Sequence, residues 1–401
     1  MNVVDPAIGR LRLAVAGRPR PWRSAALVNL VGGLDAAHLN RVCRDQPLID
    51  AVVARTRDHG PREAHRRRLI EILSVERCGV LGVRARAGCL HALQAGATGL
   101  AGQAGIVRLL LATHGGALTR LKNAVDAAPD HYDLENLVFG RLPSGEAREA
   151  VLAHIAREAE HARPAHGQPR EAKILSDVDD TAFARLNDAI YPKGALYPGV
   201  RAFWTALDHG PTGHTTSLGD LAFVTARPGD RFGLVENRLR AGLARRGVGP
   251  HSVLTGGLVH LLSHESMAAG KLANIERYRE LFPEYALVFV GDSGQGDVDT
   301  GRAMLRRWPR DVAGVFIHDV VGTPPQRRDE YADMGIWFFD TYVGAARLAH
   351  AAGLIPYSAV GDVARSAVRE FLALRGFADP GRRETAWAAL DADLAVAAAA
   401  V

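Results

Sequence analysis

The chain has 401 residues, of which 47% are hydrophobic and 23% are charged, and a formal net charge of +5. These proportions are typical of a soluble globular protein, and the length suffices for two domains of ordinary size. Aromatic residues make up only 6% of the chain and no nucleic-acid recognition module is present, so we expect no nucleic-acid partner.

The cysteines and the N-terminus favour a cytoplasmic protein. Cys43, Cys78 and Cys89 are an odd number of cysteines without a Cys-x-x-Cys spacing, which favours buried thiols in a reducing compartment over disulfides or a zinc site. The N-terminus lacks the continuous apolar segment of a secretory signal.

Residues 1 to about 165 show apolar side chains at helical spacing, so we expect a mainly helical region. Five arginines and no acidic residue lie between Pro6 and Leu34, and a second basic cluster includes residues 66–68. Two interpretations are open for these clusters. They form solvated helix faces, or they attract anionic lipid headgroups, an interaction of about 1 kcal/mol for each basic residue near a membrane surface.

The segment from Ala87 to Val107 contains no Asp, Glu, Lys or Arg. Its many Ala and Gly residues make it a poor spanning helix, so we expect a buried helical hairpin, with a shallow membrane contact as the alternative. Prolines and a glycine between 161 and 169 predict a linker to the next domain.

From Lys173 onward, predicted strands and helices alternate. Such alternation predicts a parallel sheet with helices on both faces and a ligand at the carboxyl ends of the strands. The expected strands are 173–176, 221–225, 252–259, 286–290, 313–318 and 335–339, and the expected helices are 198–209, 228–246, 270–282 and 300–308.

The first predicted strand ends in the sequence Asp-Val-Asp-Asp-Thr, residues 177–181. Carboxylates as close as those of Asp177 and Asp179 raise one another's pKa unless a cation is present. We therefore interpret them as a catalytic pair that holds a divalent metal. Oxygen ligands of this kind suit Mg²⁺, which also binds substrate phosphate.

Three further motifs follow in order. Thr225 ends the second strand, Lys271 opens a helix, and Asp292 and Asp297 share a glycine-rich loop after the fourth strand. With Asp-x-Asp-x-Thr, this order resembles the haloacid dehalogenase superfamily of aspartate-nucleophile phosphatases. The resemblance implies a doubly wound parallel, Rossmann-like α/β sheet.

A closer resemblance, over roughly residues 172–318, is to the catalytic domain of the actin-patch phosphatidate phosphatases and their bacterial relatives. It rests on residues 177–181, on Leu-Phe-Pro at 281–283 and on Val-Gly-Asp-Ser-Gly-Gln at 290–295. The chain departs from the fungal members after the second strand, where Thr225-Ala-Arg-Pro replaces a Ser-Asn-Ser-type segment. The phosphate-binding hydroxyl is retained, and the lipid specificity stays open.

The superfamily resemblance implies that Asp177 attacks phosphorus and forms an aspartyl-phosphate. Asp179 would protonate the leaving alcohol and then deprotonate the hydrolytic water. Mg²⁺ would be held by Asp177, by the backbone carbonyl of Asp179 and by Asp292, with Asp297 bound directly or through water.

Three other residues complete the expected site. Lys271 would offset charge on the transferred phosphoryl group, although a surface lysine is the alternative. Thr225, with the N–H groups after it, would bind phosphate oxygens, or else simply cap the helix expected from Pro228. Arg227 would contact phosphate, or equally pair with Asp230.

Only 43 residues separate Thr181 from Thr225, and 45 separate Thr225 from Lys271, so we expect a minimal cap. The expected organisation is a helical region over 1–165 that serves as a membrane or cap adaptor, a phosphatase domain over 172–355 and a C-terminal helical tail over 356–401.

We therefore expect an Mg²⁺-dependent phosphoric monoester hydrolase that converts phosphatidate to diacylglycerol and phosphate. It would be cytoplasmic and peripheral to the inner face of the membrane, without spanning it. The alternatives are a phosphatase for a soluble phosphomonoester, such as a sugar or nucleotide phosphate, and a non-catalytic lipid-binding scaffold. Nothing in the sequence indicates the oligomeric state.

Overall fold

The computed structural model describes residues 6–16, 20–58, 64–95, 98–128, 130–142, 145–162, 170–212, 221–228, 234–256 and 264–399. The chain divides into two compact units, Met1–Arg163 with Glu280–Pro283 and Pro164–Arg279 with Glu284–Val401.

The first unit is helical, as the sequence predicts. Its helices are α1 (Pro6–Ala16), α2 (Pro21–Gly32), α3 (Ala36–Arg44), α4 (Gln46–Arg55), α5 (His65–Glu71), α6 (Val83–Gln94), α7 (Leu100–Leu111), α8 (Gly115–Asp126) and α9 (Gly145–Ala162), with three single turns, η1 (Ile72–Glu76), η2 (Cys78–Val80) and η3 (Asn136–Gly140).

The uncharged segment 87–107 falls on α6 and α7, which pack against each other as a hairpin. The three cysteines are buried and form no disulfide, as expected. Among the described residues, no helix has the length and apolar character that a membrane span requires.

The second unit is built on a six-stranded sheet in the order β3-β2-β1-β4-β5-β6, with every neighbouring pair parallel. The strands are β1 (Ala172–Ser176), β2 (Leu221–Pro228), β3 (Ser252–Gly256), β4 (Ala286–Asp292), β5 (Val312–His318) and β6 (Ile336–Phe339). The helices are α10 (Val200–His209), α11 (Leu234–Arg245), α12 (His264–Leu281), α13 (Asp297–Arg307), α14 (Pro325–Ala332), α15 (Tyr342–Ala351), α16 (Tyr357–Ala373) and α17 (Pro380–Ala399).

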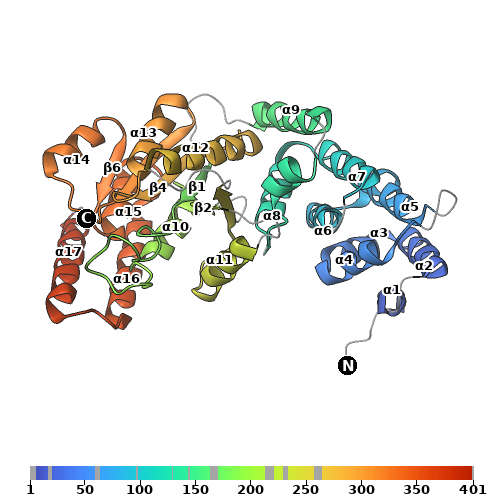
Figure 1. Ribbon diagram of the computed structural model, residues 1–401, viewed down its shortest axis with the longest axis horizontal. Coiled ribbons are helices and arrows are strands. Elements are labelled where there is room, and N and C mark those ends of the chain that lie inside the picture. The colour runs from blue at the N-terminus through green and yellow to red at the C-terminus, as the bar shows by residue number, and fades with distance from the viewer. Residues whose placement is uncertain are drawn as a thin grey trace. The chain divides into compact units, whose positions relative to one another are not determined.

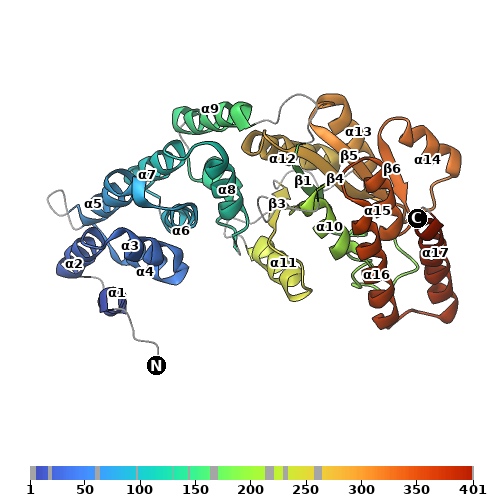
Figure 2. The same cartoon turned by 180° about the vertical axis from the view of Figure 1, so that it is seen from behind.

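Helices cover both faces of this sheet. Figure 1 shows α12 and α13 on one side of the strands and α10, α15 and α16 on the other; β3 and β5 are labelled in the reverse view of Figure 2. Every residue of β4 is buried, which explains why its sequence, Ala-Leu-Val-Phe-Val-Gly-Asp, shows no polar alternation. The predicted α/β fold class is confirmed.

The strand order places the site. From β1 the chain moves outward to β2 and β3, then returns to β4 on the other side of β1. In doubly wound sheets, ligands bind outside the carboxyl ends of the two strands where the direction of winding reverses. Here those strands are β1 and β4, which end next to Asp177 and at Asp292.

Two expected helix boundaries were wrong. The helix expected from 228 begins at Leu234, because β2 continues to Pro228. The helix expected from 270 begins at His264, since Gly270 is accommodated inside it at a modest cost, so Lys271 lies within α12 and not at its start. Residues 257–259, expected to end the third strand, lie outside the described residues.

The expected C-terminal tail corresponds to α16 and α17. Buried residues on these helices, among them Val363, Phe371 and Leu390, join the core that packs against α10, α15 and the sheet. The sheet and the tail therefore share one hydrophobic core.

Candidate active site

Three buried carboxylates meet at the carboxyl ends of β1 and β4. Candidate ligand atoms of Asp177, Asp292 and Asp297 all lie within 4.8 Å of one another. Asp177 follows β1, and its backbone N–H donates to the carbonyl of Val290 in β4 at 2.8 Å. That bond extends the β1–β4 pairing by one residue, so the two strands deliver their carboxylates to the same place.

Lys271 provides the positive charge of this cluster. Its Nζ donates to Oδ1 of Asp177 at 2.7 Å and to Oδ1 of Asp297 at 2.6 Å. The lysine side chain is 4% exposed and the aspartate side chains 6% and 0%. Because Lys271 is buried, it is not the surface lysine that the sequence left open as an alternative.

Burial and mutual repulsion disturb the ionisation of the cluster. Burial raises the pKa of Asp177 to about 7; the ammonium of Lys271 opposes the rise, and Asp297 and Asp179 add to it. Burial and the charges of Asp297 and Asp177 raise the pKa of Asp292 well above its usual value. Burial alone would lower the pKa of Lys271, but the carboxylates of Asp177 and Asp297 raise it.

The carboxylate oxygens of the cluster are not equally satisfied. Asp297 accepts from Lys271 and, at 3.2 Å, from the backbone N–H of Asp292. Asp292 accepts from the N–H of Gly294 at 2.7 Å and from Gln295 Nε2 at 3.1 Å. Oδ2 of Asp177 is buried and has no hydrogen-bond partner among the described residues. An unpaired buried carboxylate oxygen is costly unless a ligand completes it.

A divalent cation fits these residues. When all three carboxylates are ionised, as a bound cation would favour, they and the one ammonium give a net charge of −2 in a buried place. All the donors are oxygen atoms, which are the ligands that Mg²⁺ prefers. The uncompensated Oδ2 of Asp177 adds an open ligand atom, so the arrangement favours a hard divalent cation over an empty pocket.

Asp179 differs from the three clustered aspartates. Its carboxylate does not belong to the cluster, and its Oδ1 accepts from the half-exposed Arg185 at 3.0 Å. Its backbone carbonyl accepts from Gln295 Nε2 at 3.2 Å, and the same nitrogen reaches Asp292. Gln295 therefore holds the Asp179 carbonyl beside the carboxylate cluster.

The third aspartate of the motif, Asp180, shapes the loop and does not belong to the carboxylate cluster. It has a φ of 59°, a left-handed conformation that Asp tolerates better than most residues. Its carboxylate accepts backbone N–H groups from Arg185, Leu186 and Asn187. Its carbonyl accepts from the buried His318 at 2.8 Å, which ties the loop to β5.

Thr225 lies at the same edge of the sheet. Ser176 pairs with Phe223 in the parallel register of β1 and β2, so Thr225 is two residues beyond the last pair, level with the loop that begins at Asp177. It is buried. Arg227 belongs to β2, but its side chain lies outside the described part of the structure.

Beside Asp179, a cavity of about 660 Å³ opens between the 178–194 loop and α11. Apolar side chains, including Phe183 and Leu239, line part of it. Basic side chains line the rest, and they outnumber the single acidic residue of the lining. They are Arg185, Lys193, Arg238, Arg245 and Arg246.

Two glycines make the fourth motif possible. A Cβ on Gly291 would lie 2.6 Å from the Asp297 side chain, and a Cβ on Gly294 would lie 2.4 Å from that of Asn187. Either substitution would push a side chain out of place. Gly291 is therefore required by the close approach of Asp297, and Gly294 by that of Asn187.

Residues 192–319 match the family model described as the catalytic domain of phosphatidate phosphatase APP1. The resemblance to phosphatidate phosphatase catalytic domains is confirmed over this segment. It includes Thr225, Lys271, Asp292 and Asp297, while Asp177 and Asp179 precede it. No curated protein and no solved structure matches the chain. The match indicates a phosphatase enzyme and leaves the substrate to be determined.

Sequence reasoning missed several supporting residues. Gln295 belongs to the motif Val-Gly-Asp-Ser-Gly-Gln at 290–295, so its closeness in sequence to Asp292 was a usable signal. His318 and Tyr342, whose hydroxyl donates to the Thr181 carbonyl at 2.6 Å, reach the loop from β5 and α15. Nothing local in the sequence marks such distant contacts.

Replacing Lys271 by Met removes the cation from the carboxylate cluster and keeps most of the side-chain volume. We expect Lys271→Met to destabilise the chain by about 3–5 kcal/mol without metal, because it leaves buried charge uncompensated. Added Mg²⁺ should restore part of that loss, since it then meets a more negative site. Chemical denaturation with and without Mg²⁺ measures both effects.

The matched control is Arg302→Ala, which removes an exposed cation that pairs with Asp299 on α13. It should change stability by less than about 1 kcal/mol, as exposed pairs do. Equal, small effects of the two substitutions would contradict the buried ion cluster.

Proposed function

We propose that this chain is an Mg²⁺-dependent phosphatase that cleaves a phosphomonoester through an aspartyl-phosphate on Asp177, with phosphatidate as the favoured substrate. The observation that carries the proposal is the unpartnered, buried carboxylate oxygen of Asp177, fixed beside the Lys271 ammonium at the reversal point of the sheet. The family match over residues 192–319 supports the same chemistry.

In the first step, a carboxylate oxygen of Asp177 bonds to phosphorus and the bond from phosphorus to the leaving alcohol breaks. Lys271 holds Asp177 by Oδ1, so the carboxylate meets the phosphorus in one fixed orientation. The ammonium also offsets negative charge on the transferred phosphoryl group. Thr225 and the backbone after it bind the remaining phosphate oxygens.

Asp179 delivers a proton to the departing alcohol oxygen. In the second step it takes a proton from water, whose oxygen bonds to phosphorus and releases phosphate, so Asp177 regains its carboxylate. Arg185 occupies Oδ1 of Asp179 and is half-exposed, so it competes with the leaving group for this carboxyl group. The anionic substrate offers Arg185 another partner.

Asp177, Asp292 and the Asp179 carbonyl would hold the Mg²⁺, with Asp297 contributing directly or through water. When bound, the ion neutralises charge on the phosphoryl oxygens. Both oxygens of Asp297 already accept hydrogen bonds, from Lys271 and from the Asp292 N–H. We infer that Asp297 mainly positions Lys271 and the loop.

The substrate proposal rests on the cavity beside Asp179. Its basic side chains suit an anionic headgroup, and the exposed part of its apolar lining suits the first carbons of an acyl-glycerol. A soluble sugar or nucleotide phosphate satisfies the basic side chains equally but leaves the apolar ones unused. A non-catalytic scaffold has no need of a buried Asp177 oxygen, Oδ2, without a hydrogen-bond partner.

We further propose a cytoplasmic protein that binds the membrane surface peripherally through the helical unit. On α1 and α2, Leu13 and Trp22 are 78% and 61% exposed, among arginines. Exposed apolar side chains beside basic ones suit an anionic bilayer. Arg12 pairs with Asp45 at 2.8 Å, so only part of the positive charge is available.

The activity is tested by Mg²⁺-dependent phosphate release from phosphatidate in mixed micelles, beside para-nitrophenyl phosphate. We expect release from both, with phosphatidate preferred. Asp177→Asn should reduce turnover to the blank, because the nucleophile is lost, and Asp179→Asn should lower it about 10²–10⁴-fold. Asp299→Asn, an exposed aspartate on α13, is the control and should leave turnover unchanged.

Release from the small ester alone would keep the mechanism and refute the lipid substrate. Full activity of Asp177→Asn would refute the nucleophile. If the wild type released phosphate from neither substrate, the result would favour the non-catalytic scaffold.

Membrane binding is tested with Trp22→Ser, because Leu27 and Val31 on α2 are buried and deletion of the helix would disturb the unit's core. We expect about tenfold weaker sedimentation with anionic vesicles, since the indole loses its apolar contact with the bilayer. The matched control is Leu100→Ala, an exposed residue on α7. Equal vesicle binding by wild type and Trp22→Ser would contradict the proposed surface.

A further inference from the structure

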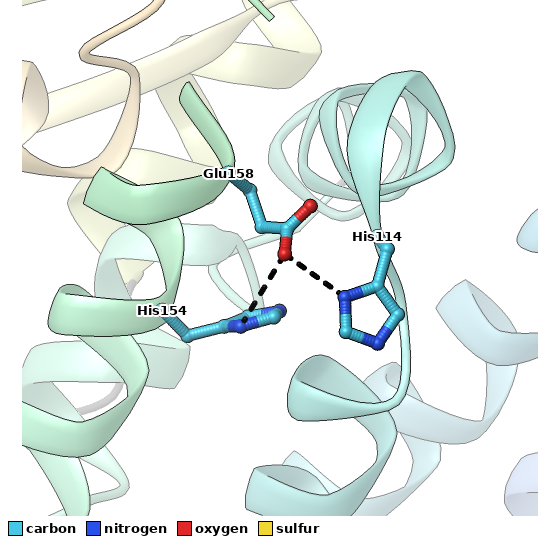
Figure 3. Close-up of side chains that lie close together, drawn as sticks. All are labelled: His114, His154 and Glu158. Atoms are coloured by element: carbon cyan, nitrogen blue, oxygen red, sulfur yellow. Dashed lines mark hydrogen bonds and ion pairs between the residues drawn. The ribbon is translucent and has the colours of Figure 1, made fainter. Parts of the chain in front are cut away.

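A second cluster of metal-ligating side chains lies in the helical unit, outside the phosphatase chemistry. His114 precedes α8, and His154 and Glu158 lie four residues apart on one face of α9. Candidate ligand atoms of the three residues lie within 4.8 Å of one another. Figure 3 shows both imidazoles directed toward the same carboxylate.

His154 is held in the orientation that metal-binding histidines adopt. It is buried, and its Nε2 lies 2.9 Å from the backbone carbonyl of Thr113, which can only accept, so Nε2 carries the proton. In the neutral ring, Nδ1 then carries no proton and presents a lone pair. Donation of the other ring N–H to a backbone carbonyl is the usual way in which proteins orient a histidine ligand.

The lone pair of His154 faces another electron-pair donor. Its Nδ1 lies 4.0 Å from Oε1 of Glu158, which is too far for a hydrogen bond. Two electron-pair donors that face each other at this distance leave room for a cation between them. A metal at ordinary zinc–ligand distances of about 2.0–2.2 Å from each atom needs only a small closure of this gap.

Glu158 is positioned by a second contact. Its Oε2 accepts from the backbone N–H of Gly115 at 2.7 Å, at the start of α8, which leaves Oε1 for the two histidines. His114 Nδ1 lies 2.9 Å from that Oε1. In the absence of metal, a proton of His114 fills the space between these two atoms.

A metal ion can take the place of that proton. The His114 side chain is 66% exposed, so its ring can carry its proton on Nε2, toward water, and present Nδ1 to the ion. The same exposure gives the ion an entry path. In the tautomer that the Thr113 carbonyl selects, Nδ1 of His154 offers its lone pair to the ion, and Glu158 offers Oε1.

We propose that His114, His154 and Glu158 form a binding site for a divalent transition-metal ion, with Zn²⁺ as the preferred ion. Two imidazole nitrogens and one carboxylate oxygen, with an open fourth position for water, form a ligand set typical of zinc. Mg²⁺ prefers oxygen ligands, so this site and the aspartate cluster select different ions. The bound ion would fasten the start of α8 to α9.

The experiment uses Co²⁺ as a spectroscopic probe of the full-length chain after chelator treatment, with excess Mg²⁺ to occupy the aspartate cluster. We expect one Co²⁺ per chain, with the strong visible absorption of four-coordinate cobalt, and its displacement by Zn²⁺. Zn²⁺ alone should raise the melting temperature. His114→Ala and Glu158→Gln should each weaken binding at least about tenfold, and Glu158→Gln retains an acceptor for Gly115.

His38→Ala is the matched control. His38 also contacts a carboxylate, with Nδ1 2.7 Å from Asp35 Oδ2, but no second histidine is near that pair among the metal-ligating groups of the described residues. It should bind Co²⁺ as the wild type does. Absence of the visible band in the wild type would overturn the proposal, and so would an unchanged band in both His114→Ala and Glu158→Gln. Circular dichroism confirms that each variant is folded.

Discussion

The ammonium of Lys271, buried between two carboxylates, is the interaction on which the site depends. Without it, Asp177 and Asp297 would face each other in a buried place with no counter-charge, an arrangement that proteins avoid. With it, the cluster remains short of positive charge, because Asp292 adds a third carboxylate. This remaining negative charge is what the proposed function assigns to a divalent cation and a phosphoryl group.

The sheet explains how residues so distant in sequence meet. Winding reverses between β1 and β4, so a ligand site is expected outside the carboxyl ends of these two adjacent parallel strands. Asp177 and Asp292 occupy those ends, and α12 brings Lys271 between them. The proposed catalytic groups thus stand at the ends of strands and on a helix, while the glycine-rich loop only has to turn tightly enough to bring in Asp297.

The sequence was sufficient to predict the parallel sheet, because buried strands and amphipathic helices alternate along it. It was also sufficient to place the carboxylates at the edge of the sheet, because their motifs stand at strand ends. It failed at the start of α12, where Gly270 looked like a boundary and is an interior residue. It did not reveal the pairing of Asp179 with Arg185, nor the tie from His318 to the motif loop, because such contacts depend on packing between elements. The His114 cluster was invisible for the same reason.

The central claim is that phosphorus becomes bonded to Asp177. The most direct measurement is rapid quenching of the enzyme during turnover, reduction of any acyl phosphate with borohydride, and peptide mass spectrometry. The account predicts that Asp177 alone is converted to the corresponding alcohol, and that the product accumulates in Asp179→Asn, where hydrolysis of the intermediate is slowed. Reduction at another aspartate, or at none during active turnover, would contradict it.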